Sequence, residues 1–143
     1  MKVFIIFLAI LIINTSFLSY QGDMGCYIRC QNFLKAVAEE CAAGAALYYD
    51  EAAYAEGLFQ FSYEEGYKYI DFLINNSKNK MPLPKECTLS YEVLFEDDIL
   101  GYESDNCIPS VTVIITAVTD DLFDLPFIEV TKVQRAAKYE LPQ

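Results

Sequence analysis

Residues 26–49 have the sequence CYIRCQNFLKAVAEECAAGAALYY, and this segment sets the architecture of the whole chain. Apolar side chains recur in it every three or four positions: Cys30, Leu34, Val37, Cys41, Ala45 and Tyr48. This is the period of a helix with one apolar face, and the segment is rich in Ala, Leu, Lys and Glu and lacks Pro. The small residues around Gly44 would let a second helix approach closely.

A second helical region is predicted from about residue 50 to 76. Asp50 suits an N-cap, and a stripe at helical spacing follows, with Gly57 and Gly66 as positions where the helix can bend or break. The short connection predicts that the two helices pack as an antiparallel pair. Residues 75–86, NNSKNKMPLPKE, are polar and contain two Pro, so we expect an exposed loop there.

The rest of the chain carries strand signals. Leu89, Tyr91, Val93 and Phe95 alternate with mostly polar residues, and residues 111–119, VTVIITAVT, are dense in β-branched side chains. Residues 127–133 fit either a strand or the start of a helix running on through RAAKYE. The predicted fold is therefore α+β, an N-terminal helical pair followed by a small antiparallel sheet, with an all-α fold as the alternative.

The first twenty residues, MKVFIIFLAILIINTSFLSY, have the layout of a secretory signal peptide. Lys2 precedes an apolar run from Val3 to Ile13, and polar residues follow it. We therefore expect residues 1–20 to be a signal peptide and 21–143 a single disulfide-stabilised secreted domain without a membrane span. Ser19 and Gly22 are the candidate last residues of the signal, although each has an aromatic residue two places earlier. An uncleaved anchor is the alternative.

Charge and composition exclude several function classes. Beyond residue 20 there are nine basic and 21 acidic residues, so nucleic acid is not expected as a partner. Histidine is absent, which excludes Ser–His and Cys–His nucleophilic systems and histidine-ligated metal centres. The remaining titratable residues form no recognisable catalytic arrangement. We therefore expect no enzyme activity, no cofactor and no metal centre.

Five cysteines in a secreted chain predict disulfide bonds. Cys26, Cys30 and Cys41 fall on one face of the predicted helix, so the expected pairing joins Cys30 or Cys41 to Cys87 or Cys107. Two bridges would leave one cysteine over. The odd thiol is expected either to be buried or to link two copies as a disulfide-bonded dimer.

Three other features are candidate sites. Asn75 begins an N-glycosylation sequon, Asn75-Asn76-Ser77. A cluster of acidic residues forms either a weak cation site or a solvated acidic loop, and its spacing does not fit an EF-hand. The cluster comprises Glu96, Asp97, Asp98, Glu103 and Asp105. A group of aromatic residues is expected to belong to the core, with an apolar ligand pocket as the alternative. These residues are Tyr48, Tyr49, Tyr54, Phe59, Tyr63, Tyr67 and Tyr69.

These observations predict a secreted, extracellular, non-enzymatic protein that binds an unknown extracellular protein or matrix. One alternative is an acidic matrix or mineral-associated protein that collects calcium. Another is a carrier of a small apolar ligand.

Overall fold

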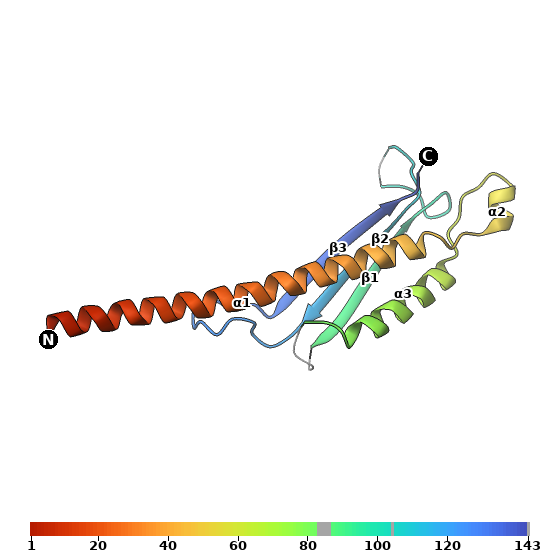
Figure 1. The fold of residues 1–143 in the computed structure, drawn as a ribbon. Helices are drawn as coiled ribbons and strands as arrows, with labels where there is room; N and C mark the ends of the chain where they lie inside the picture. Colours follow the sequence, from red (N-terminus) through yellow and green to blue (C-terminus); the bar gives the residue numbers. More distant parts are fainter. Residues whose placement is uncertain (83–86, 104, 143) are drawn as a thin grey trace.

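A long helix and a shorter one cover the same face of a three-stranded antiparallel sheet (Figure 1). The computed structural model describes residues 1–82, 87–103 and 105–142. Its elements, in chain order, are α1 Lys2–Ala45, α2 Glu51–Ala55, α3 Tyr63–Lys78, β1 Thr88–Glu96, β2 Ser110–Val118 and β3 Lys132–Glu140. Helices therefore precede the sheet along the chain, and the predicted α+β fold is confirmed.

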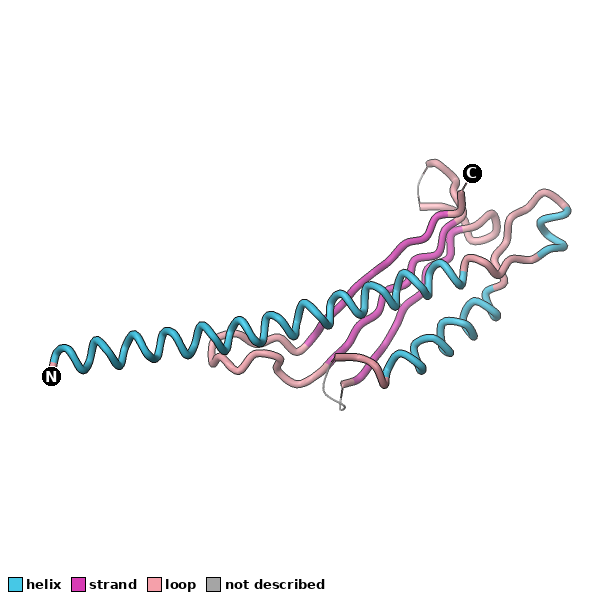
Figure 2. The backbone as a smooth tube through the Cα atoms, in the orientation of Figure 1, coloured by secondary structure: helices cyan, strands magenta, loops and turns pink. Residues whose placement is uncertain are grey.

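Helix α1 is much longer than the segment that its apolar spacing predicts. It begins at Lys2 and continues through the polar residues 14–16 without a break (Figure 2). Asn14 and Thr15 donate side-chain hydrogen bonds to the carbonyls of Ile10 and Leu11, one turn earlier in the same helix. Because these side chains bond to carbonyls of the helix itself, they are accommodated within it and do not end it.

The second predicted helical region is divided in two. Asp50 caps α2 as expected, because its Oδ1 accepts hydrogen bonds from the backbone N–H groups of Ala52 and Ala53 at 2.9 and 3.2 Å. Gly57 has a φ of +86°, and the chain leaves α2 there. Helix α3 then returns along α1 to form the antiparallel pair, with its last turn extending into the predicted loop (Figure 1).

The sheet is a meander in the order β1-β2-β3. Its inner face is apolar and packs on the helices, with Phe95 from β1, Val113 and Ile115 from β2, and Val133 from β3 all buried. Strand β3 starts at Lys132 and includes RAAKYE, so the strand expected for residues 127–133 is right only for its last two residues, and the alternative of a helix running on through RAAKYE is wrong. Pairing with β2 along nine residues outweighs the helix propensity of Ala136 and Ala137.

The disulfide prediction is wrong. All five cysteines are free: Cys30, Cys41 and Cys87 are buried, Cys26 is half-buried and Cys107 is exposed. A bridge is not needed to join the helices to the sheet, because they share one core. Burial also raises the pKa of the Cys30 thiol to about 11 and that of Cys41 to about 12, which disfavours their thiolates.

Candidate functional site

Three segments that are remote in sequence meet at the end of the domain opposite the N-terminus (Figure 1). They are residues 46–62 around α2, residues 97–103 and 105–109 between β1 and β2, and the C-terminal residues 141–142, and we call this region the distal end. Tyr49 and Phe61 form an isolated antiparallel bridge, and the Leu141 N–H donates to the Pro109 carbonyl at 3.0 Å. Backbone hydrogen bonds therefore tie the distal end together.

A buried carboxylate organises this region. Asp97 is fully buried, and its Oδ2 accepts hydrogen bonds from the Phe61 N–H at 3.1 Å and the Tyr63 hydroxyl at 2.6 Å. Its Oδ1 accepts from the N–H groups of Ile99 and Leu100 at 3.1 and 2.8 Å. Four donors thus converge on one side chain, which fixes the β1–β2 loop against the start of α3. Burial, together with the same contact with Asp97, raises the pKa of Tyr63.

Asp98 adds a second link between the same segments. Its Oδ2 accepts from the Phe59 N–H at 2.7 Å, while its own N–H donates to the Phe59 carbonyl at 3.1 Å. The Tyr102 hydroxyl donates to Oδ1 at 2.7 Å. The hydrogen bond from Tyr102 makes the largest contribution to lowering the pKa of Asp98, and the one from the Phe59 N–H comes next. Phe59 is therefore held on both sides of its backbone.

An apolar groove of about 390 Å³ lies beside the held segment, and we call it the aromatic groove. It is lined by Ala46, Leu47, Tyr49, Tyr54, Phe59, Pro109, Leu141 and Pro142. Tyr49 meets Tyr54 edge-on with ring centroids 5.6 Å apart, and Tyr54 meets Phe59 edge-on at 6.3 Å. Leu47 and Tyr54 remain 71% and 61% exposed, so the groove presents large apolar side chains to solvent.

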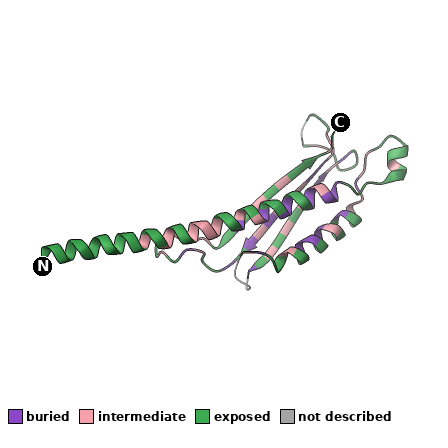
Figure 3. Cartoon of the chain, viewed as in Figure 1, coloured by how far each residue is buried: buried purple, intermediate pink, exposed green. Residues whose placement is uncertain are grey.

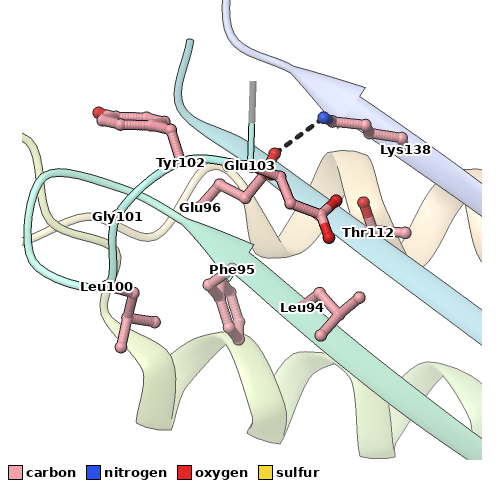
Figure 4. A pocket seen from close by; sticks show the side chains of 9 residues that line it. All are labelled: Leu94, Phe95, Glu96, Leu100, Gly101, Tyr102, Glu103, Thr112 and Lys138. Atoms are coloured by element: carbon pink, nitrogen blue, oxygen red, sulfur yellow. Dashed lines mark hydrogen bonds and ion pairs between the residues drawn. The ribbon is translucent and has the colours of Figure 1, made fainter. Parts of the chain in front are cut away.

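A more polar depression of about 580 Å³ lies at the same end, on the open face of the sheet. Figure 4 shows Glu96 and Lys138 pointing toward one another across it, and Lys138 Nζ lies 2.8 Å from Glu96 Oε2. The Ser110 hydroxyl also donates to Glu96, and the Glu103 N–H donates to its Oε1 at 3.1 Å. Lys138 and then Ser110 lower the pKa of Glu96 to about 2. Glu96 is therefore a paired carboxylate and a poor proton acceptor near neutral pH.

The five predicted cation ligands do not converge on a common point. Glu96 and Asp97 are committed to the hydrogen bonds described above, whereas Asp105 is exposed. Within residues 1–82, 87–103 and 105–142, no three Cys, Asp or Glu side chains are grouped so that they could hold a metal ion. Glu103 contributes its backbone N–H to Glu96, and Asp98 is engaged with Phe59 and Tyr102.

The other predicted site residues are divided between the distal end and the rest of the domain. Asn75 is exposed in the last turn of α3, rather than in a loop. Of the aromatic residues predicted as core or pocket, Tyr49, Tyr54 and Phe59 line the groove, while Tyr63 and Tyr67 pack on Phe95.

Sequence reasoning missed one wall of the groove. Pro109, Leu141 and Pro142 contribute it, and nothing in their local sequence connects them with Tyr54.

Searches against protein-family models, curated proteins and solved structures find no match to this chain.

Proposed function

We propose that this protein acts outside the cytoplasm, without catalysis, by binding a partner protein through the aromatic groove at its distal end. The observation that carries the proposal is the combination of exposed aromatic side chains with a fixed backbone. Tyr is among the side chains that most often supply the binding energy at protein interfaces. The hydrogen bonds of Asp97 and Asp98 hold the segment that presents Phe59, so little ordering is required on binding.

Charge around the groove favours a particular partner chemistry. Asp50, Glu51 and Glu56 are exposed in and beside α2, next to Tyr54. An apolar side chain flanked by Lys or Arg would place its apolar part among the aromatic rings and its charges near these carboxylates. The expected ligand is therefore a protein segment with an apolar anchor and basic neighbours. Its association rate should fall as salt concentration rises.

Site-specific photo-crosslinking tests this proposal. A photo-reactive amino acid replaces Leu47 in the groove or, as a control, Phe72 on α3, which is similarly exposed at 65% but lies elsewhere. In the cell that produces the protein, the Leu47 variant should give a discrete adduct with one identifiable protein, and the Phe72 variant should not. With that partner purified, Tyr54→Ala should weaken binding by about 30-fold, the effect of a 2 kcal/mol hot spot.

Two results would contradict the proposal. One is an adduct from position 72 and none from position 47. The other is unchanged partner binding by the Tyr54→Ala variant.

A small apolar ligand is the second candidate occupant, because the groove volume lies within the usual range for ligand sites. Native mass spectrometry of the purified chain distinguishes the two. A bound small molecule that is lost in Tyr54→Ala would favour a carrier.

A further inference from the structure

The first part of α1 is a long apolar surface with no protein against it. Figure 3 shows this end of the helix exposed on all sides, whereas the later turns are buried against the sheet. Within the described residues, α1 is a helix long and apolar enough to cross a membrane, and its most apolar 18-residue window has no buried residue. Such a surface requires either removal or an apolar environment.

The apolar segment is longer than its sequence suggests. Asn14 Nδ2 and Thr15 Oγ1 each donate a hydrogen bond to a carbonyl of their own helix, at 2.8 and 3.0 Å, which lowers the cost of placing these side chains in lipid. The span therefore extends from Val3 to Tyr20. At ~1.5 Å per residue this is ~27 Å, close to the ~30 Å hydrocarbon core of a bilayer.

The two ends of the segment suit the two surfaces of a membrane. Lys2 stands before it, and positive residues favour the cytoplasmic side. Tyr20 stands at the other end, where aromatic residues are common at the membrane interface. The acidic residues all follow it, on the outer side.

The region where a signal would be cut is poorly suited to cleavage. The expected last residues, Ser19 and Gly22, follow Phe17 and Tyr20 where a small residue is favoured two places earlier. The same region is helical and already packed on the domain. The Tyr20 ring lies 5.9 Å from that of Phe123 between centroids, and Asp23 Oδ2 accepts from the Asp124 N–H at 3.1 Å.

We propose that residues 3–20 are an uncleaved anchor in a lipid bilayer, with the sheet domain on the outer side. The apolar surface is covered by lipid acyl chains. Because α1 is unbroken from Lys2 to Ala45, the domain begins at the membrane surface with no linker between them. The distal end then faces away from the membrane (Figure 1).

The test is expression of the full chain with a C-terminal tag, followed by alkaline carbonate extraction of membranes and mass spectrometry of the N-terminus. The wild-type protein should stay in the membrane pellet and retain residues 2–20. The matched variant is Phe17→Ala, which creates a small-x-small pair with Ser19 and leaves the domain contacts from Tyr20 onward intact. It should be cut after Ser19 and released into the medium.

The proposal is overturned if the wild-type chain begins between residues 20 and 23 and is released as efficiently as Phe17→Ala. It is also overturned if the uncut chain is extracted by carbonate. Orientation is tested by labelling the exposed Cys107 on intact cells with a membrane-impermeant thiol reagent. Labelling should occur without permeabilisation, and labelling only after permeabilisation would contradict the proposed orientation.

Discussion

Asp97 shows how much one buried residue can determine. Its carboxylate accepts four hydrogen bonds and orders two segments that are more than 30 residues apart. Asp97→Ala leaves four buried or part-buried donors unpaired and should lower the free energy of unfolding by about 3 kcal/mol. Asp97→Asn keeps an acceptor and should cost about half as much. Urea unfolding of the full chain in mild detergent measures both, with Asp105→Asn as an exposed control.

A change of less than 0.5 kcal/mol in Asp97→Ala, about that of an ordinary surface substitution, would show that the loop does not depend on this carboxylate.

Glu96 gives the molecule a defined acid response. Its pKa is lowered to about 2 by Lys138 and Ser110, so the contribution to stability is present above pH 4.5 and is lost as the pH falls toward 2. Because the pair is partly solvated, we expect about 1–2 kcal/mol. Glu96→Gln should be less stable at pH 7 and should lose less between pH 4.5 and 2. Glu92→Gln, on the same strand and face, is the control.

Unfolding midpoints at several pH values provide the measurement. Parallel pH profiles for wild type and Glu96→Gln would contradict this role for the ion pair.

At the scale of elements, the ring of Tyr69 on α3 packs against α1 at Gly44, which has no side chain. A Cβ at Gly44 would lie 2.0 Å from Cε1 of Tyr69, so Gly44→Ala must displace the Tyr69 ring. Alanine improves helix propensity by about 1 kcal/mol, but the displaced packing costs about 1–3 kcal/mol. We expect a net loss of stability in urea unfolding. Gly25→Ala, with no atom within 4 Å, should instead be neutral or stabilising.

The double variant Gly44→Ala/Tyr69→Leu should recover part of the loss, because it removes the atoms that the new methyl group meets. If Gly44→Ala is as stable as Gly25→Ala, the packing of the Tyr69 ring on Gly44 does not contribute to stability.

The strand patterns predicted β1 and β2 because their alternation and β-branching report directly on a half-buried, pleated surface. For β3 the local signal fails. Ala136, Ala137 and Lys138 favour a helix, and only pairing with β2 makes them a strand. The same limit applies to the groove. The sequence identifies Tyr54 and Phe59 as aromatic residues of a core or a pocket, but only the tertiary fold brings Leu141 to them.

At the scale of the whole molecule, the alkylation rate of the buried thiols measures the cooperative unfolding of the domain. Cys30 and Cys41 lie on the face of α1 that packs in the core, and their raised pKa values keep them protonated. They should be alkylated only when α1 separates from the sheet, at a rate set by global unfolding. Exposed Cys107 should react within the first pulse. Peptide mass spectrometry after timed alkylation distinguishes the sites.

Destabilising variants such as Asp97→Ala should accelerate alkylation of Cys30 and Cys41 equally. Reaction of Cys41 well ahead of Cys30 would show that the end of α1 opens on its own.

Because α1 is unbroken, it also determines the volume in which the groove can meet a partner. A binding module on a flexible linker samples a large volume, so its effective concentration at any one point is low. Here the groove stands ~38 Å beyond Tyr20, at ~1.5 Å for each residue to Ala45, and no loop in α1 allows it to swing. On a membrane, the groove would move within a thin layer at a constant distance from the bilayer surface. It would often meet partners whose binding segment lies at that distance and would not meet partners whose binding segment lies closer to the bilayer.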